Sequence, residues 1–75
     1  MARIETQRQK QERLFTNWVI VMLNERNLRQ KDLADYLGIT QQAVSKKCRY
    51  LCGWSLAEMA DCVEFFGEPY TVTLK

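Results

Sequence analysis

The stretch "LRQKDLADYLGITQQAVSKK", residues 28–47, decides the fold of this chain of 75 residues. Its first half carries an apolar stripe at helical spacing, which consists of Leu28, Leu33, Ala34 and Leu37. Gly38 follows where a helix ends in a left-handed cap, and Thr40 is a favourable N-cap for the next helix. The stretch therefore predicts a helix over about residues 30–37, a tight turn, and a second helix that begins at Gln41.

This second helix is expected to reach Tyr50 or Leu51, because Gly53 then ends it. At about 100° per residue, one face is apolar and is predicted to pack on the core; it carries Val44, Cys48 and Leu51. The opposite face carries amides, a hydroxyl and cations, namely Gln42, Ser45, Lys46 and Arg49, with Gln41 on its boundary. Lys47 lies beside the apolar face, so its stem is expected to pack while its ammonium group reaches out.

The segment before this stretch predicts a longer helix. "LFTNWVIVMLNERN", residues 14–27, repeats apolar residues every three or four positions, which is the pattern of an amphipathic helix. We expect this helix to begin within residues 5–12 and to end near Arg26. Residues 1–12 are predicted to form a polar N-terminal extension to it.

The segment after the stretch predicts a last helix and a tail. Ser55 stands three residues before a glutamate, which is the capping-box spacing, so a helix is expected over about residues 56–66. Residues 68–75, "EPYTVTLK", form either an extended tail or a short strand that pairs with the same strand of a second subunit. We therefore expect residues 1–75 to form a single all-α domain of four helices with a short extended or β tail.

Charge is distributed unevenly along the chain, although its net value is only +2. Residues 38–53 contain three cations and no acid, whereas residues 54–75 contain four acids and one lysine. Such one-sided charge suggests orientation toward a polyanion. Three cysteines without any histidine favour reduced thiols over a metal site. No nucleophile–base pair or phosphate-binding glycine loop indicates an enzyme, and no apolar run is long enough to span a membrane.

The residues quoted first resemble a known family. Their Gln, Leu-Ala, Leu-Gly-Ile, Thr-Gln and Val-Ser pattern is similar to the helix-turn-helix of phage repressors and Cro proteins, also called Xre-like regulators. "WSLAEMADCVEFFG", residues 54–67, resembles the family's following helix, and the similarity covers about residues 14–67. The resemblance implies a λ-repressor-like fold in which the helix over about residues 41–51 lies in the major groove of double-stranded DNA. Lys47 departs from the pattern, because many members have an apolar residue there.

The resemblance also implies which residues contact DNA. They are Arg29, Gln30, Thr40, Gln41, Gln42, Ser45, Lys46 and Arg49. Gln41 and Gln42 match the base-reading pair after the turn, and a glutamine amide can pair with the N6 and N7 edge of adenine. The other side chains match positions that face the groove or contact the phosphate backbone.

The function implied is a sequence-specific transcription regulator of the Cro or repressor type, encoded by a phage or mobile element and cytoplasmic in its host. We expect a homodimer, joined through the C-terminal tail, on a near-palindromic operator. No cofactor, metal, membrane or small-molecule ligand is expected. Residues 1–12 are either a solvated helix start or a basic arm on the DNA backbone. The alternative is a protein-interaction module, or an antitoxin or excision-type accessory protein, that uses the acidic last helix and tail.

Overall fold

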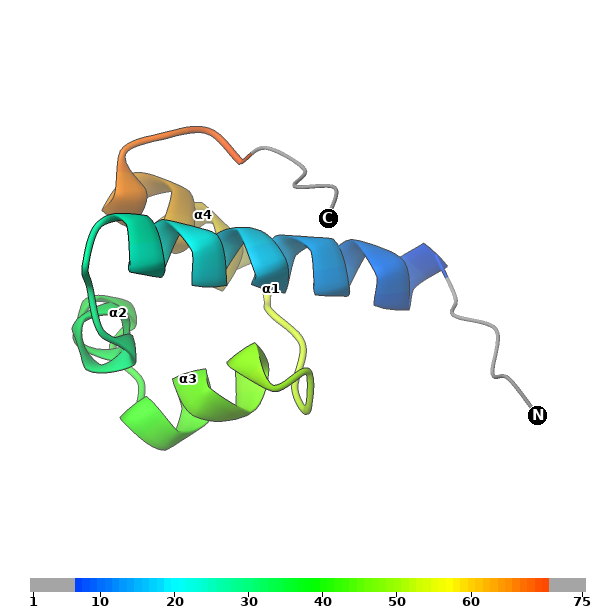
Figure 1. The fold of residues 1–75 in the computed structure, drawn as a ribbon. Coiled ribbons are helices and arrows are strands. Elements are labelled where there is room, and N and C mark those ends of the chain that lie inside the picture. The colour runs from blue at the N-terminus through cyan, green and yellow to red at the C-terminus, as the bar shows by residue number, and fades with distance from the viewer. Residues whose placement is uncertain (1–6, 71–75) are drawn as a thin grey trace.

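Four α-helices make up the regular structure of this protein. The structure is a computed structural model that describes residues 7–70, and its helices are α1 (Gln7–Glu25), α2 (Gln30–Leu37), α3 (Gln41–Cys48) and α4 (Leu56–Phe66). In Figure 1, α1 spans the molecule, α3 runs below it and α4 lies behind it, while α2 closes one end. No strand occurs between residues 7 and 70, so the all-α fold is confirmed. The observed bounds of α2 and α4 match the predicted ones.

One hydrophobic core joins the four helices. Six apolar residues of the predicted amphipathic pattern on α1 are buried, namely Leu14, Phe15, Trp18, Val19, Met22 and Leu23. The other helices contribute two residues each: Leu33 and Ala34 from α2, Val44 and Cys48 from α3, and Cys62 and Phe66 from α4. Helices of eight residues, such as α2 and α3, are not stable alone in water. Burial in this shared core is what stabilises them.

The turn between α2 and α3 has the predicted geometry. Gly38 adopts φ 74°, and its backbone N–H donates to the carbonyl oxygen of Ala34 at 2.9 Å. Two residues later, the Thr40 hydroxyl oxygen accepts a hydrogen bond from the Ala43 backbone N–H at 3.1 Å. Backbone groups at both helix ends in the turn therefore have hydrogen-bond partners within the turn, which fixes the direction in which α3 leaves α2.

The end of α3 differs from the prediction. The helix stops at Cys48, because Tyr50 adopts φ 65° in the left-handed region. The backbone N–H groups of Tyr50 and Leu51 donate back to the carbonyl oxygens of Lys47 and Lys46, which is the pattern of a Schellman cap. The Tyr50 hydroxyl donates to the side-chain oxygen of Asn17 on α1. The prediction that Leu51 continues the apolar stripe was wrong, since the chain has left the helix and Leu51 is 67% exposed.

Trp54 attaches the loop between α3 and α4 to α1. Its indole N–H donates to the Thr16 hydroxyl oxygen at 2.9 Å, and that hydroxyl donates to the carbonyl oxygen of Glu12 at 2.8 Å. Trp54 and Thr16 are both buried, and the Phe15 ring meets the indole edge-on at 5.4 Å between centroids. The loop therefore ends in a fixed position on α1 immediately before α4 begins.

The segment after α4 returns over α1. Gly67, at φ 71°, ends α4 as predicted, and Glu68 pairs with Arg26 at the end of α1 at 3.1 Å. The Tyr70 ring packs against Phe15 and Trp18. Residues 68–70 form no strand, and the rest of the predicted extended or β tail lies outside the described residues. The first six residues of the N-terminal extension also lie outside them.

The hydrogen bond from Trp54 predicts the effect of a nearly isosteric substitution. Thr16→Val removes the acceptor and leaves a buried indole N–H without a partner, so the free energy of unfolding should fall by about 1–3 kcal/mol. Urea unfolding measures this loss. Thr16→Ser is the control, because it keeps the hydroxyl and loses only a methyl group. An equal or larger loss in Thr16→Ser would show that packing, rather than the hydrogen bond, makes Thr16 important.

Candidate nucleic-acid interface

The outer face of α3 carries most of the predicted contact residues. Gln41, Gln42, Lys46 and Arg49 are exposed and Ser45 is half-buried, while Val44 and Cys48 on the opposite face are buried. Among residues 7–70, the side chains of those four exposed residues have no hydrogen-bond or ion-pair partner. The structure thus brings two amides and two cations together on one helix face and leaves their polar groups available to a ligand.

The remaining predicted residues lie at the N-termini of α2 and α3. The Thr40 hydroxyl accepts the N-cap hydrogen bond of α3, and its own proton is still available to donate. Arg29 and Gln30 lie at the start of α2, about 12 Å along that helix from the turn. Arg29 is exposed, but its guanidinium Nε lies 3.9 Å from the carboxylate of Asp32. It therefore presents a weaker positive charge than the residues of α3.

The charges near α3 make its outer face positive. Most described cations elsewhere have an acidic partner, as in the pairs Arg8–Glu12, Arg26–Glu68, Arg29–Asp32 and Lys31–Asp35. Lys46 and Arg49 belong to an acid-free segment and have no such partner among the described residues. They also lie near the C-terminal end of α3, where the helix dipole favours cations.

Lys47 points inward, contrary to the prediction that its ammonium group reaches out. Its side chain is only 12% exposed. The ammonium group donates to the carbonyl oxygen of Gly53 at 2.8 Å, lies 3.1 Å from the Glu58 carboxylate, and stands 5.5 Å from the centre of the Trp54 ring. The loop and the first turn of α4 supply all of these partners. Neighbouring lysines on α3 therefore have opposite roles, with Lys46 outward and Lys47 inside.

The Glu58 carboxylate has a second partner besides the Lys47 ammonium group. Its carboxylate also accepts from the backbone N–H of Ser55 at 2.9 Å, while the Ser55 hydroxyl oxygen accepts from the Glu58 N–H at 3.1 Å. This is the capping box expected from the sequence. Burial acts to raise the pKa of Glu58, but the Ser55 amide and Lys47 together outweigh it and hold that pKa below its ordinary value.

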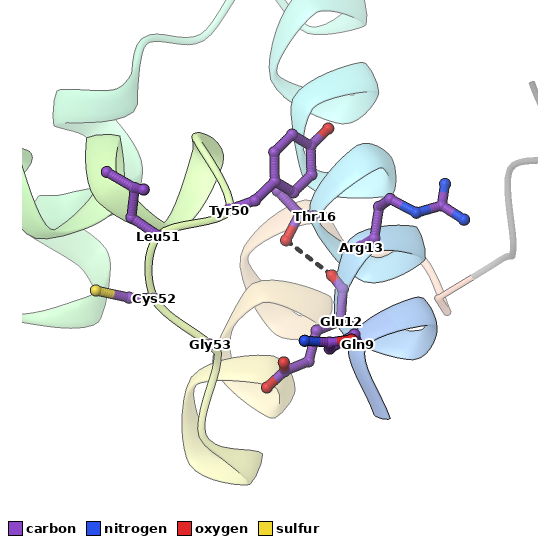
Figure 2. A pocket seen from close by; sticks show the side chains of 8 residues that line it. All are labelled: Gln9, Glu12, Arg13, Thr16, Tyr50, Leu51, Cys52 and Gly53. Atoms are coloured by element: carbon purple, nitrogen blue, oxygen red, sulfur yellow. Dashed lines mark hydrogen bonds between the residues drawn. The ribbon is translucent and has the colours of Figure 1, made fainter. Parts of the chain in front are cut away.

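A groove of about 450 Å³ lies beside the end of α3, between α1 and the following loop. Figure 2 shows the residues that line it, namely Gln9, Glu12, Arg13, Thr16, Tyr50, Leu51, Cys52 and Gly53. A Cβ atom at Gly53 would meet the end of the Glu12 side chain, which is flexible and can move aside. This groove could not be predicted from the sequence, because its position depends on where the left-handed Tyr50 directs the chain.

The cysteines do not form a chemical site. Cys48 and Cys62 are buried, and burial raises the pKa of both thiols, that of Cys62 to about 12. Cys52 is exposed in the loop. Between residues 7 and 70 there is no cluster of three or more potential metal-ligating residues.

The turn between α2 and α3 and the cationic outer face of α3 are features of a helix-turn-helix. A family model described as a helix-turn-helix matches residues 21–46, from the second half of α1 into α3. Over these residues, the match supports the resemblance to the helix-turn-helix of the Xre, Cro and λ-repressor type. Neither a curated protein nor a solved structure matches the chain significantly. Within the described part of the chain, no helix has the length and apolar character needed to cross a membrane.

The environment of Glu58 predicts how acid affects stability. Because its folded-state pKa lies below the ordinary value of 4.5, the ionised carboxylate stabilises the fold fully above that pH. This contribution is lost as pH falls through the lower folded-state pKa. Urea unfolding across this acid range should show a steeper loss for the wild type than for Glu58→Gln, which does not titrate. Glu25→Gln removes an exposed carboxylate and should keep the wild-type slope. Parallel curves for the wild type and Glu58→Gln would contradict the assignment.

Proposed function

We propose that this protein is a sequence-specific regulator of transcription of the Cro or repressor type, encoded by a phage or mobile element. The supporting observation is the outer face of α3, where Gln41, Gln42, Lys46 and Arg49 are exposed without partners among residues 7–70. An α-helix fits the major groove of B-DNA, and residues near the N-terminus of the recognition helix reach the base edges. The two glutamines at the start of α3 occupy those positions.

Each contact residue is assigned a role by its chemistry. The Gln42 amide can donate and accept at once, so it reads an adenine, and Gln41 reads a neighbouring base. Lys46 lies one turn further along α3 and reads a guanine or binds a phosphate. Arg49, at the end of α3, binds the phosphate backbone. The other residues, Arg29, Gln30, Thr40 and Ser45, position the protein through phosphate and sugar contacts.

A dimer would place two such helices about 34 Å apart, which matches one turn of DNA. An apolar groove of about 270 Å³ between α1 and α4 supports this assembly; its lining is Gln11, Phe15, Met59, Ala60, Val63 and Tyr70. Leu56 is 86% exposed and precedes Met59 and Ala60 on the same side of α4. We assign the dimer contact to this face, which the C-terminal tail joins through Tyr70. Bound at a promoter, the dimer would block polymerase without any chemical step.

The first experiment selects the protein against random duplex DNA at near-physiological salt. Enrichment of a two-fold symmetric site supports a dimeric regulator and gives the half-site spacing. An asymmetric site would instead indicate an excision-type accessory role. Weak, salt-sensitive binding without any enriched sequence would contradict the proposal and favour an antitoxin or another protein-interaction module.

Two substitutions separate base reading from backbone contact. Gln42→Ala should cost about 1–3 kcal/mol on the selected site and relax the preference at one base pair. Arg49→Ala should weaken selected and random DNA about equally and reduce the slope of log K against log salt by about 0.9. Fluorescence anisotropy at several salt concentrations measures both effects. The assignment of readers is wrong if the two variants change specific and random binding in the same way.

The proposed dimer surface is tested at its most exposed apolar residue. Leu56→Glu should convert the dimer to a monomer in sedimentation equilibrium and should change the unfolding free energy of the monomer by no more than about 0.5 kcal/mol, because the side chain is exposed. Ala57→Glu is the matched control, since it adds the same charge to the neighbouring exposed position. If both variants remain dimeric, the contact lies elsewhere.

A further inference from the structure

Helix α3 packs mainly against α2 and α1 and makes far fewer contacts with α4. The helix has eight residues, and only Val44 and Cys48 are buried among them. Both belong to one stripe that packs against the core, so a contact on the side of α4 adds a restraint on rotation about the helix axis. Base readers have to be held within about 0.5 Å of their productive positions. The structure should therefore contain a further contact that fixes this rotation.

Lys47 makes such a contact. It lies to one side of the stripe formed by Val44 and Cys48, and its ammonium group is bound by the Gly53 carbonyl at 2.8 Å and the Glu58 carboxylate at 3.1 Å. These partners are themselves fixed. The Ser55 backbone N–H holds Glu58 at 2.9 Å, and the next residue after Gly53 is the buried Trp54.

We propose that Lys47 is a positioning residue for DNA recognition, which fixes the rotation of α3 relative to α4 and so aims Gln42 and Lys46, without contacting DNA. This inference rests on the proposed function. The Lys47 side chain is 12% exposed and its charge is balanced by Glu58. A phosphate contact would require the ammonium group to give up its hydrogen bond to Gly53 and its ion pair with Glu58. Lys46, the adjacent exposed residue, has no such partner among residues 7–70.

The inference makes an unusual prediction for Glu58→Gln. Removal of a negative charge beside a DNA-binding helix should, by electrostatics alone, strengthen binding to any DNA. If Glu58 instead acts through Lys47, the variant should bind the selected site about tenfold more weakly and random DNA no more weakly than the wild type. Lys47→Met should show a similar loss on the selected site with an unchanged salt slope. The double variant should lose no more than the worse single variant, because both act through one contact.

Lys46→Met is the matched control for Lys47→Met. It removes an exposed, unpaired cation and should reduce the salt slope by about 0.9 on all DNA. The inference is overturned if Lys47→Met reduces the slope by the same amount, or if Glu58→Gln tightens binding to the selected site. All measurements are made where circular dichroism shows the variant folded. Should Lys47→Met fail to fold, Glu58→Gln alone decides the outcome.

A second measurement needs no DNA. Backbone amide resonances of Gln42, Ser45 and Lys46 in the free protein should shift in Glu58→Gln, although these residues do not contact Glu58, because α3 reorients. Unchanged resonances on the outer face of α3 would overturn the inference even if the protein binds its site. Conversely, if the wild type selects no DNA sequence, the proposed function fails, while this spectrum still decides whether Lys47 orients α3.

Discussion

The arrangement of the helices depends on the buried Trp54 side chain. Its indole N–H binds Thr16 on α1, its ring lies beside the Lys47 ammonium group on α3, and its backbone leads directly into α4. A tryptophan suits this position because it combines a large apolar surface with one donor that must be satisfied when buried. The Thr16 hydroxyl oxygen accepts this hydrogen bond, and the same hydroxyl donates to the backbone carbonyl oxygen of Glu12 on its own helix. Three helices are thus fixed relative to one another through a single residue of a loop.

This arrangement lets a very short helix serve two purposes. The inner side of α3 is held by Val44, Cys48 and Lys47, so the exposed side chains of the helix are not needed to hold it in place. The left-handed Tyr50 ends the helix early and ties the loop to α1 through Asn17. A non-glycine residue in this conformation costs about 1 kcal/mol, which the hydroxyl contact and the capping bonds offset. The core contacts and the exposed polar face of α3 therefore use different side chains of the same eight residues.

The ends of a helix could be predicted where residues nearby in the sequence mark them. The bounds of α2 and α4 could be predicted because Gly38 and the capping box of Ser55 mark helix ends in the sequence itself. The end of α3 could not, because its left-handed residue is a tyrosine, and nothing in its neighbours indicates that conformation. The exposed face of α3 was predicted from helical periodicity alone. The inward position of the Lys47 ammonium group was not predicted. Helical periodicity gives the direction of a side chain, but it does not show that a carboxylate eleven positions later binds it.

The different exposure of the three thiols offers a way to observe the protein at work. Cys52 is exposed four residues after α3, whereas Cys48 and Cys62 are buried and their raised pKa values keep them protonated and unreactive. A thiol-directed dye would therefore attach to the native chain at one place, without engineered substitutions. It would be attached beside the end of α3, close to the proposed path of the DNA backbone. Its fluorescence would report each encounter with DNA in real time.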